Sequence, residues 1–485
     1  MKNKMTDQSC RGGKMFLAAS SILLMMLFAP ATVPAGNPES IGRMEIVSLT
    51  DFAGNAGKLA EKIAPDLQAL PFLGIIALTL NPEYQALDFS APVSVFIYSQ
   101  NDKFLWCAAV GSNPNQKLPD TVKFIGHEAF VKKLGNRIGL SYSKPLLNSI
   151  NSLPPLMAPV KDDNLSTVLL TLDMAKYLNG CKDDYSEVRN KYLENALLKN
   201  LEKRHGKVPA EKMKQTAEEI EKLIRQIGKM TVKFNVLPDC IDIRLALEAA
   251  SGSDLSEFIS RQSQNKVQLM PVVKNKAIAA SVDMEAAPDM IRRLPGLLFE
   301  FQNDPQLAPG IKSLLAVVTA SIDNRFSYYT DLENGKPVFF LKTESRTEKI
   351  SFLKKTFDID GIKPLADDTY CVKEYDAGKH PAIYCKLYYD TIAVISGEID
   401  AKRALELLKE SEDPDKLLTL EKQENPIQIF LQHENEPVPS AVSVDMKDNR
   451  INIKIRVNPL LVKKFIPAAL LDKSKNANIP SSFSN

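Results

Sequence analysis

The sequence predicts an α+β protein of two related halves, each built of antiparallel β-hairpins with helices packed on one face. Three observations predict this fold. Four segments alternate apolar and polar residues with the period of two that is typical of half-buried strands, and each contains a central turn. The order strand, aspartate, helix recurs three times. Residues 184–228 carry apolar side chains at spacings of three and four, which indicates an inserted helical hairpin.

The composition is that of an ordinary globular protein. The chain has 485 residues, of which 44% are hydrophobic and 25% are charged, so fibrous and wholly disordered chains are excluded. This length allows about two to four domains of the usual size. The formal net charge is only +2, and the basic residues are scattered along the chain. We therefore expect no nucleic-acid partner, because nucleic-acid binders present a concentrated basic surface.

The first 35 residues have the three parts of a secretory signal peptide. A polar, basic stretch (1–14) precedes an apolar run (15–28), and a short proline-containing segment of small residues (29–35) follows. The apolar run is shorter than the about 20 residues that a membrane-spanning helix needs. We therefore expect cleavage before Gly36 and a secreted or periplasmic protein. The alternative is an uncleaved anchor, which would be the chain's predicted membrane contact.

Three aspartates follow predicted strands and precede helical patterns. They are Asp51 after 44–50, Asp173 after 167–172 and Asp283 after 277–282. An aspartate at this position accepts the free N–H groups of the first helical turn and is favoured by the helix dipole. We interpret all three as candidate helix caps. The alternative is catalysis, but no histidine occupies a matching position, and we predict no catalytic residue.

The four predicted hairpins suggest an internal duplication. They span 93–110, 230–247, 325–342 and 441–457. The third contains Asn334-Gly335, a strong turn signal. The alternative is that the succession of strand, helix and hairpin is common in proteins without duplication. The similar surroundings of Asp173 and Asp283 would then be coincidence.

Breaks rich in proline or polar residues place the domain boundaries. The first half is predicted at 44–265, subdivided into 44–153 and 166–265. The second is predicted at 276–470, subdivided into 276–410 and 426–470. The polar tail, 474–485, is predicted to be disordered. The helical hairpin at 184–228 either covers its own sheet or projects toward a partner.

Cys371 and Cys385 are the best candidates for a disulfide. They flank a turn-like segment almost symmetrically, and the export route permits disulfides. The alternative is two buried free thiols on neighbouring strands, because sequence spacing does not fix the direction of the Cβ vectors.

Catalytic, cofactor and metal motifs are absent from the sequence. It contains no G-x-S-x-G elbow, phosphate loop, dinucleotide fingerprint, C-x-x-C pair or H-E-x-x-H. The four histidines, His127, His205, His380 and His433, lie in different segments without metal-ligand spacing. We therefore predict no metal, no cofactor and an exported, non-catalytic binding or scaffold module whose partner is an unknown protein or an apolar ligand. The alternatives are a carrier of a lipid-like ligand in a groove between sheets, and a hydrolase with a site assembled across the fold.

Overall fold

The computed structural model is predominantly antiparallel β-sheet. Among the residues that the structure describes, 54% are in strands and 24% in helices, and twenty strands carry the fold. The predicted α+β fold class is therefore wrong. The described residues are 39–63, 85–100, 103–124, 127–151, 167–180, 218, 221–264, 267–273, 278–284, 325–333, 336–344, 363–365, 368–374, 376, 382–388, 391–418, 426–431 and 440–459.

The chain divides into two compact units that interleave in sequence. Unit 1 contains the described residues of Met1–Ser186, Lys229–Leu245 and Ile455–Asn485, and unit 2 those of Glu187–Gly228 and Ala246–Lys454. Each predicted half, by contrast, is one continuous segment.

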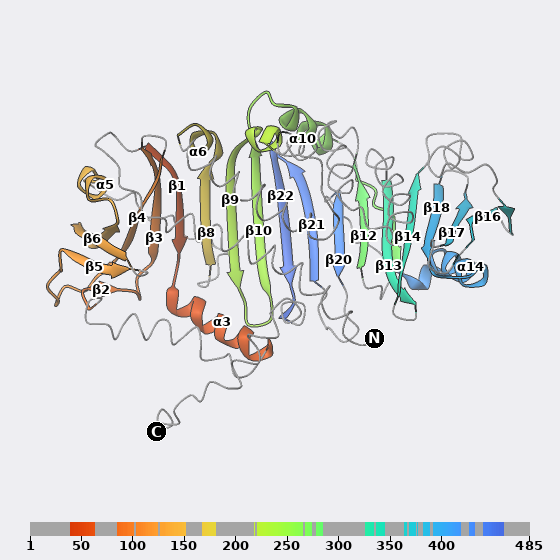
Figure 1. Cartoon of the computed structure of the whole chain (residues 1–485), viewed down its shortest axis with the longest axis horizontal. Coiled ribbons are helices and arrows are strands. Elements are labelled where there is room, and N and C mark those ends of the chain that lie inside the picture. Colours follow the sequence, from red (N-terminus) through yellow and green to blue (C-terminus); the bar gives the residue numbers. More distant parts are fainter. Residues whose placement is uncertain are drawn as a thin grey trace, which may run out of the picture. The chain divides into compact units, whose positions relative to one another are not determined.

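The sheet of unit 1 is antiparallel, in the order β5-β6-β7-β4-β3-β1-β8-β9, and β2 also pairs with β4. Figure 1 shows β1 between β3 and β8. The elements of this unit and its boundary are β1 (Glu39–Ile46), α3 (Leu49–Ile63), β2 (Leu87–Asp88), β3 (Val93–Gln100), β4 (Lys103–Ser112), β5 (Thr121–Phe124), β6 (His127–Leu134), β7 (Arg137–Ser141), α5 (Lys144–Ser149), β8 (Thr167–Asp173), α6 (Met174–Gly180), β9 (Ile227–Val236) and β10 (Ile241–Ala249).

The sheet of unit 2 has the order β21-β20-β12-β13-β14-β18-β17-β16-β15, again antiparallel throughout. A separate two-stranded sheet pairs β11 with β19. The elements are α10 (Asp254–Gln264), β11 (Val272–Val273), β12 (Ile278–Asp283), β13 (Arg325–Glu333), β14 (Lys336–Glu344), β15 (Lys363–Pro364), β16 (Thr369–Lys373), β17 (Ala382–Leu387), β18 (Thr391–Gly397), α14 (Ala401–Glu410), β19 (Leu417–Leu418), β20 (Ile427–Leu431), β21 (Ser440–Lys447) and β22 (Arg450–Val457).

The two units share one connectivity. In each, a first strand (β1 or β12) pairs with a hairpin (β3–β4 or β13–β14), and the hairpin is extended by a meander that ends at β7 or β18. A short helix follows the meander, α5 in unit 1 and α14 in unit 2. The chain then returns to the free side of the first strand as β8 or β20.

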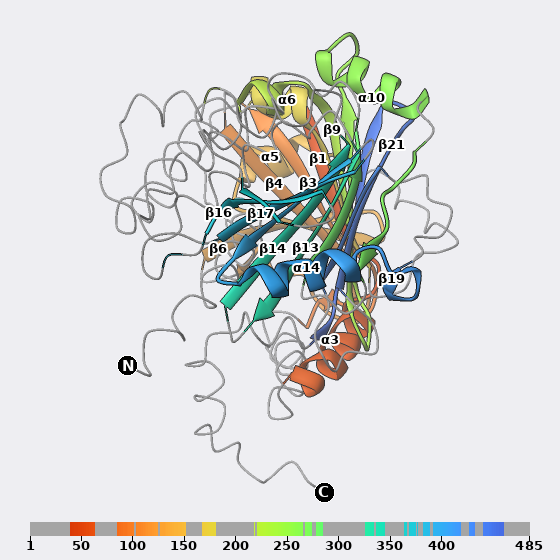
Figure 2. The same cartoon turned by 90° about the vertical axis from the view of Figure 1, so that its right-hand side faces the viewer.

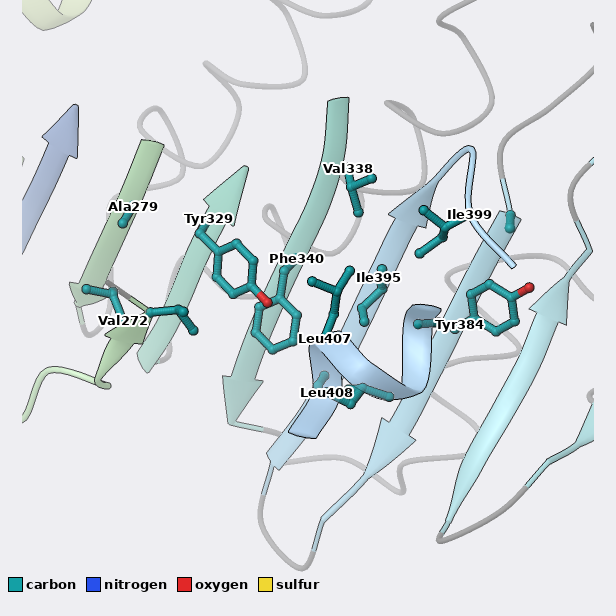
Figure 3. Close-up of a cluster of buried hydrophobic side chains, with 14 of the residues drawn as sticks. Val272, Ala279, Tyr329, Val338, Phe340, Tyr384, Ile395, Ile399, Leu407 and Leu408 are labelled. Carbon is teal, nitrogen blue, oxygen red and sulfur yellow. The ribbon is translucent and has the colours of Figure 1, made fainter. Parts of the chain in front are cut away.

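The core of unit 2 lies under α14, which crosses one face of its sheet (Figures 2 and 3). Asp400 caps the helix, since its side chain accepts the backbone N–H of Arg403 at 2.8 Å. Leu407 and Leu408 then point at the sheet, where Phe340 is stacked on Tyr329 with 4.5 Å between ring centroids.

The corresponding core of unit 1 lies under α5. Ser143 caps this helix, and Leu146 and Leu147 pack into a cluster with Phe96 and Cys107. Leu59 of α3 packs with Val236 of β9 on the opposite face of the same sheet. Helices therefore lie on both faces in unit 1, and not on one as expected.

All four predicted hairpins are confirmed: β3–β4, β9–β10, β13–β14 and β21–β22. The turn between β21 and β22 has positive φ at both Asp448 and Asn449, the backbone that a tight two-residue hairpin turn needs. Most of the predicted helical insertion, 184–228, lies outside the described residues. Its expected last residue, Gly228, lies in β9 instead. The signal segment 1–35 and the tail 474–485 are also outside the described residues.

Candidate functional site

Four side chains on one face of the unit 1 sheet form what we call the buried charge cluster: Arg43, Glu45, Ser94 and Arg137. Arg43 and Glu45 are two residues apart on β1 and so share a face. Glu45 stands opposite Ser94 on β3, and Arg43 stands opposite Phe96. Arg137 comes from β7 and stands opposite Gly111 on β4. A Cβ at Gly111 would meet Asp88 and Ala91, and the Arg137 side chain reaches past β4 to Ser94 on β3.

A chain of hydrogen bonds joins the four side chains. Arg137 Nη2 donates to Ser94 Oγ at 3.1 Å, and Ser94 Oγ donates to Glu45 Oε1 at 3.0 Å. Arg43 Nη2 forms an ion pair with the same carboxylate oxygen. Arg137 Nη2 also lies 2.7 Å from the carbonyl oxygen of Ala109. The cluster is therefore positioned by three strands and by the backbone of a fourth.

The cluster carries two positive charges and one negative charge; the carboxylate is buried, and both arginines are partly exposed. Glu45 is 5% exposed and Ser94 is fully buried. Two further donors, Arg43 Nε and Arg137 Nη1, are buried and have no hydrogen-bond partner in the part of the chain that the structure describes. Burial lowers the pKa of Arg137, the Glu45 carboxylate raises it, and the positive charge of Arg43 lowers it. One positive charge thus lacks a counter-charge within the cluster.

Unit 2 fills the matching positions with small uncharged residues. When the two hairpins are aligned at the residue pairs next to their turns, Ser94 and Ser327 occupy the same position. The partner of Ser327 on β12 is Ser281, and the residue two positions before it is Ala279. Arg137 matches Thr391 on β18. All four residues of unit 2 are buried. The shared connectivity therefore does not require charges at these positions.

The three predicted caps have different surroundings in the structure. Asp173 accepts the backbone N–H of Lys176 at 2.9 Å, the bond expected of an N-cap of α6. Asp51 lies inside the first turn of α3, where Ser48 Oγ accepts its N–H at 3.1 Å, so Ser48 is the capping side chain. Asp283 ends β12 and accepts the backbone N–H of Gln268 at 2.6 Å. The segment after Met284 lies outside the described residues.

The structure does not bring Cys371 and Cys385 together. Cys371 stands opposite Tyr384, and Cys385 stands opposite Tyr370, so the two thiols point to opposite faces of the β16–β17 pair. Cys371 packs in the core under α14, whereas Cys385 packs in a cluster with Ile383. Both are free thiols. This geometry argues against the predicted disulfide.

Two buried thiols of the described chain are held in their protonated form. Burial raises the pKa of the Cys107 thiol to about 12, and it also raises the pKa of Cys385. A thiolate is the reactive species, so neither thiol is an activated nucleophile.

We expect Cys107 and Cys385 to resist alkylation by iodoacetamide at pH 8 in the folded protein, and to react once the protein is denatured. Peptide mass spectrometry after labelling measures this. Rapid labelling of either residue without unfolding would contradict the burial and raised pKa described above.

No group of three His, Cys, Asp or Glu side chains suited to a metal ion occurs among the described residues. His127 begins β6, and the other three histidines lie outside the described ranges. No helix within those ranges is long and apolar enough to cross a membrane.

Sequence reasoning missed the buried charge cluster. A local signal was present, because Arg43 and Glu45 flank Met44, the first residue of the strand predicted at 44–50. Arg137 gave no such signal, since its neighbours in the cluster come from strands that only the pairing register brings close.

Comparison with known proteins gives no relative. The chain matches no protein-family model, no curated protein and no solved structure. The functional argument therefore depends on the geometry of the chain itself.

Proposed function

We propose that this chain is an exported, non-catalytic protein of the envelope or the extracellular space, acting as a binding or scaffold module. The signal-like segment at 1–35 supports export. The strand order common to units 1 and 2 supports two related halves, which extend the repeated architecture expected from the hairpins.

The observation that carries the binding assignment is the chemistry of the buried charge cluster. Its two guanidinium groups stay protonated across the physiological pH range, so they serve as fixed charges and donors rather than as acids or bases. Glu45 already accepts hydrogen bonds from Arg43 and Ser94. Cys107, the thiol that interacts electrostatically with Arg137, has a raised pKa. Such a cluster is suited to holding a charged group and offers no activated nucleophile.

The test is a screen for turnover combined with native mass spectrometry of the protein released gently from its own source. We expect no hydrolysis of ester, glycoside or peptide substrates, and we expect extra mass that is lost on denaturation. The extra mass would report a bound ligand or a partner protein.

Hydrolysis that a single substitution in this chain abolishes would contradict the proposal, because it would show a site with catalytic residues. Purifying the wild type and the variant by the same procedure controls for a contaminating enzyme, because a contaminant would remain in both preparations.

A further inference from the structure

We propose that the buried charge cluster is a binding site for the anionic group of a ligand, a carboxylate or a phosphate, with Arg43 and Arg137 as its charged contacts. This inference rests on the proposed function as a binding protein. Ser94 is a positioning residue, since it links Arg137 to Glu45 through its hydroxyl group.

The first argument is the balance of charges and donors. Two guanidinium groups share one carboxylate, and burial makes an uncompensated charge costly. Arg43 Nε and Arg137 Nη1 are buried donors without acceptors among the described residues. A buried water would satisfy these N–H groups and leave the excess positive charge. An oxyanion supplies both acceptors and the missing charge, and guanidinium groups bind carboxylates and phosphates well.

The second argument is the comparison with unit 2. Its matching positions, Ala279, Ser281 and Thr391, are buried without any charge. At these three positions the same connectivity folds around small side chains, while the ion pair Arg325–Glu344 lies beside them on the same face. Unit 1 instead buries one carboxylate and partly buries two guanidinium groups, which is unfavourable for stability unless hydrogen bonds and counter-charges offset it. Binding of an anion accounts for that difference.

The third argument is accessibility. Arg43 keeps 16% of its side-chain surface exposed, whereas Glu45 keeps 7%. Arg43 is thus the more exposed partner of this ion pair, and Glu45 is the more buried one. The Arg43 guanidinium also lies 5.1 Å from the centre of the Phe96 ring, which restrains its position. A preorganised, partly exposed guanidinium is well suited to meeting an incoming anion.

Isothermal titration calorimetry of the full chain tests the site with three probes: sodium acetate, sodium octanoate and inorganic phosphate. We expect saturable binding of at least one probe by the wild type, weakened by 0.5 M salt because the contact is ionic. Arg43→Gln and Arg137→Gln should each weaken binding by about tenfold or more, as expected when a partly buried charge partner is removed. The three probes separate the sources of the anion: preference for octanoate over acetate indicates an amphipathic carboxylate, and binding of phosphate alone indicates a phosphate group.

The decisive variant is Glu45→Gln. It removes the competing carboxylate and raises the charge of the cluster from one positive to two, while the amide oxygen still accepts a hydrogen bond. We expect about fivefold tighter anion binding or more from this change. If the cluster has only a structural role, removing its carboxylate would loosen it, and anion binding would not become tighter.

The matched control is Arg325→Gln in unit 2. Arg325 is a partly buried arginine that pairs with Glu344 and donates to Gln268 at 2.6 Å, so it also belongs to a polar network. We expect anion binding to be unchanged in this variant. Circular dichroism of each variant reports folding. If both arginine variants fail to fold, the comparison of Glu45→Gln with the wild type still decides.

Two results would overturn the proposal: no saturable binding of any probe by the folded wild type, or binding that Glu45→Gln fails to strengthen. Neither result would remove the proposed function, because native mass spectrometry can still detect a neutral ligand or a protein partner. Conversely, turnover of a substrate would contradict the proposed function while leaving the measured anion affinity in place.

Discussion

Replacing Phe340 by alanine is expected to lower the free energy of unfolding of unit 2 by about 3–5 kcal/mol, the usual range for truncating a fully buried phenylalanine. Phe340 is 1% exposed. Its ring is stacked on Tyr329 and belongs to the same buried cluster as Leu407 and Leu408 of α14 (Figure 3). The substitution leaves a cavity between the sheet and the helix. It also removes the stacking contact between the two aromatic rings.

Hydrogen exchange followed by mass spectrometry measures this loss locally, in peptides covering β13, β14 and β18. We expect faster exchange there as the free energy of opening falls. The control is Leu365→Ala, because Leu365 is a large apolar residue that is 37% exposed. Its substitution is expected to change stability by no more than about 0.5 kcal/mol. A loss below about 1 kcal/mol for Phe340→Ala would contradict the packing under α14.

The hairpins could be predicted from sequence because their strands alternate clearly. The strands beside them were harder to recognise. In β6, Lys132 and Lys133 are adjacent, so one charged side chain necessarily faces the buried side and interrupts the alternation. In β18, every residue is buried, and the central four residues, 392–395, form an apolar run without any period. Strands of both kinds enlarged the sheet beyond what the pattern indicated, and the α+β prediction failed for that reason.

The candidate site was less predictable than the fold. Arg43 and Glu45 are local neighbours, but their meaning depends on Arg137, whose place is fixed by the pairing of β7 with β4 and of β4 with β3. Register between distant strands is not encoded in any short segment. The predicted caps show the opposite case. Asp173 needs only the next three residues to form its hydrogen bond to Lys176, so local sequence was enough.

Lys132→Met is expected to lower the free energy of unfolding of unit 1 by about 2–3 kcal/mol, because hydrogen bonds to a charged donor are among the stronger ones. Lys132 Nζ donates to the carbonyl oxygens of Leu147, Asn148 and Ile150, at 3.1, 3.2 and 2.8 Å. These carbonyls lie at the end of α5, where helices have unsatisfied acceptors and favour a cation.

A six-residue helix such as α5 is too short to be stable alone. It therefore depends on its contacts with the sheet, among them Lys132. Unit 2 has a lysine at the same register position: Lys386 stands opposite Ala393 as Lys132 stands opposite Gly139. Lys386 pairs with Glu412 at 2.7 Å, just beyond the end of α14. The position thus contacts the C-terminal region of the covering helix in both units.

Urea denaturation followed by tryptophan fluorescence measures the effect in unit 1. Trp106 is the single tryptophan of the chain, is 3% exposed, and contacts Tyr142 edge to face at 4.8 Å. Lys133→Met is the matched control, since the neighbouring side chain is exposed and the same charge is lost. We expect a lower urea midpoint for Lys132→Met and almost no shift for Lys133→Met. Equal shifts for the two variants would show that net charge, and not the three carbonyl contacts, explains the role of Lys132.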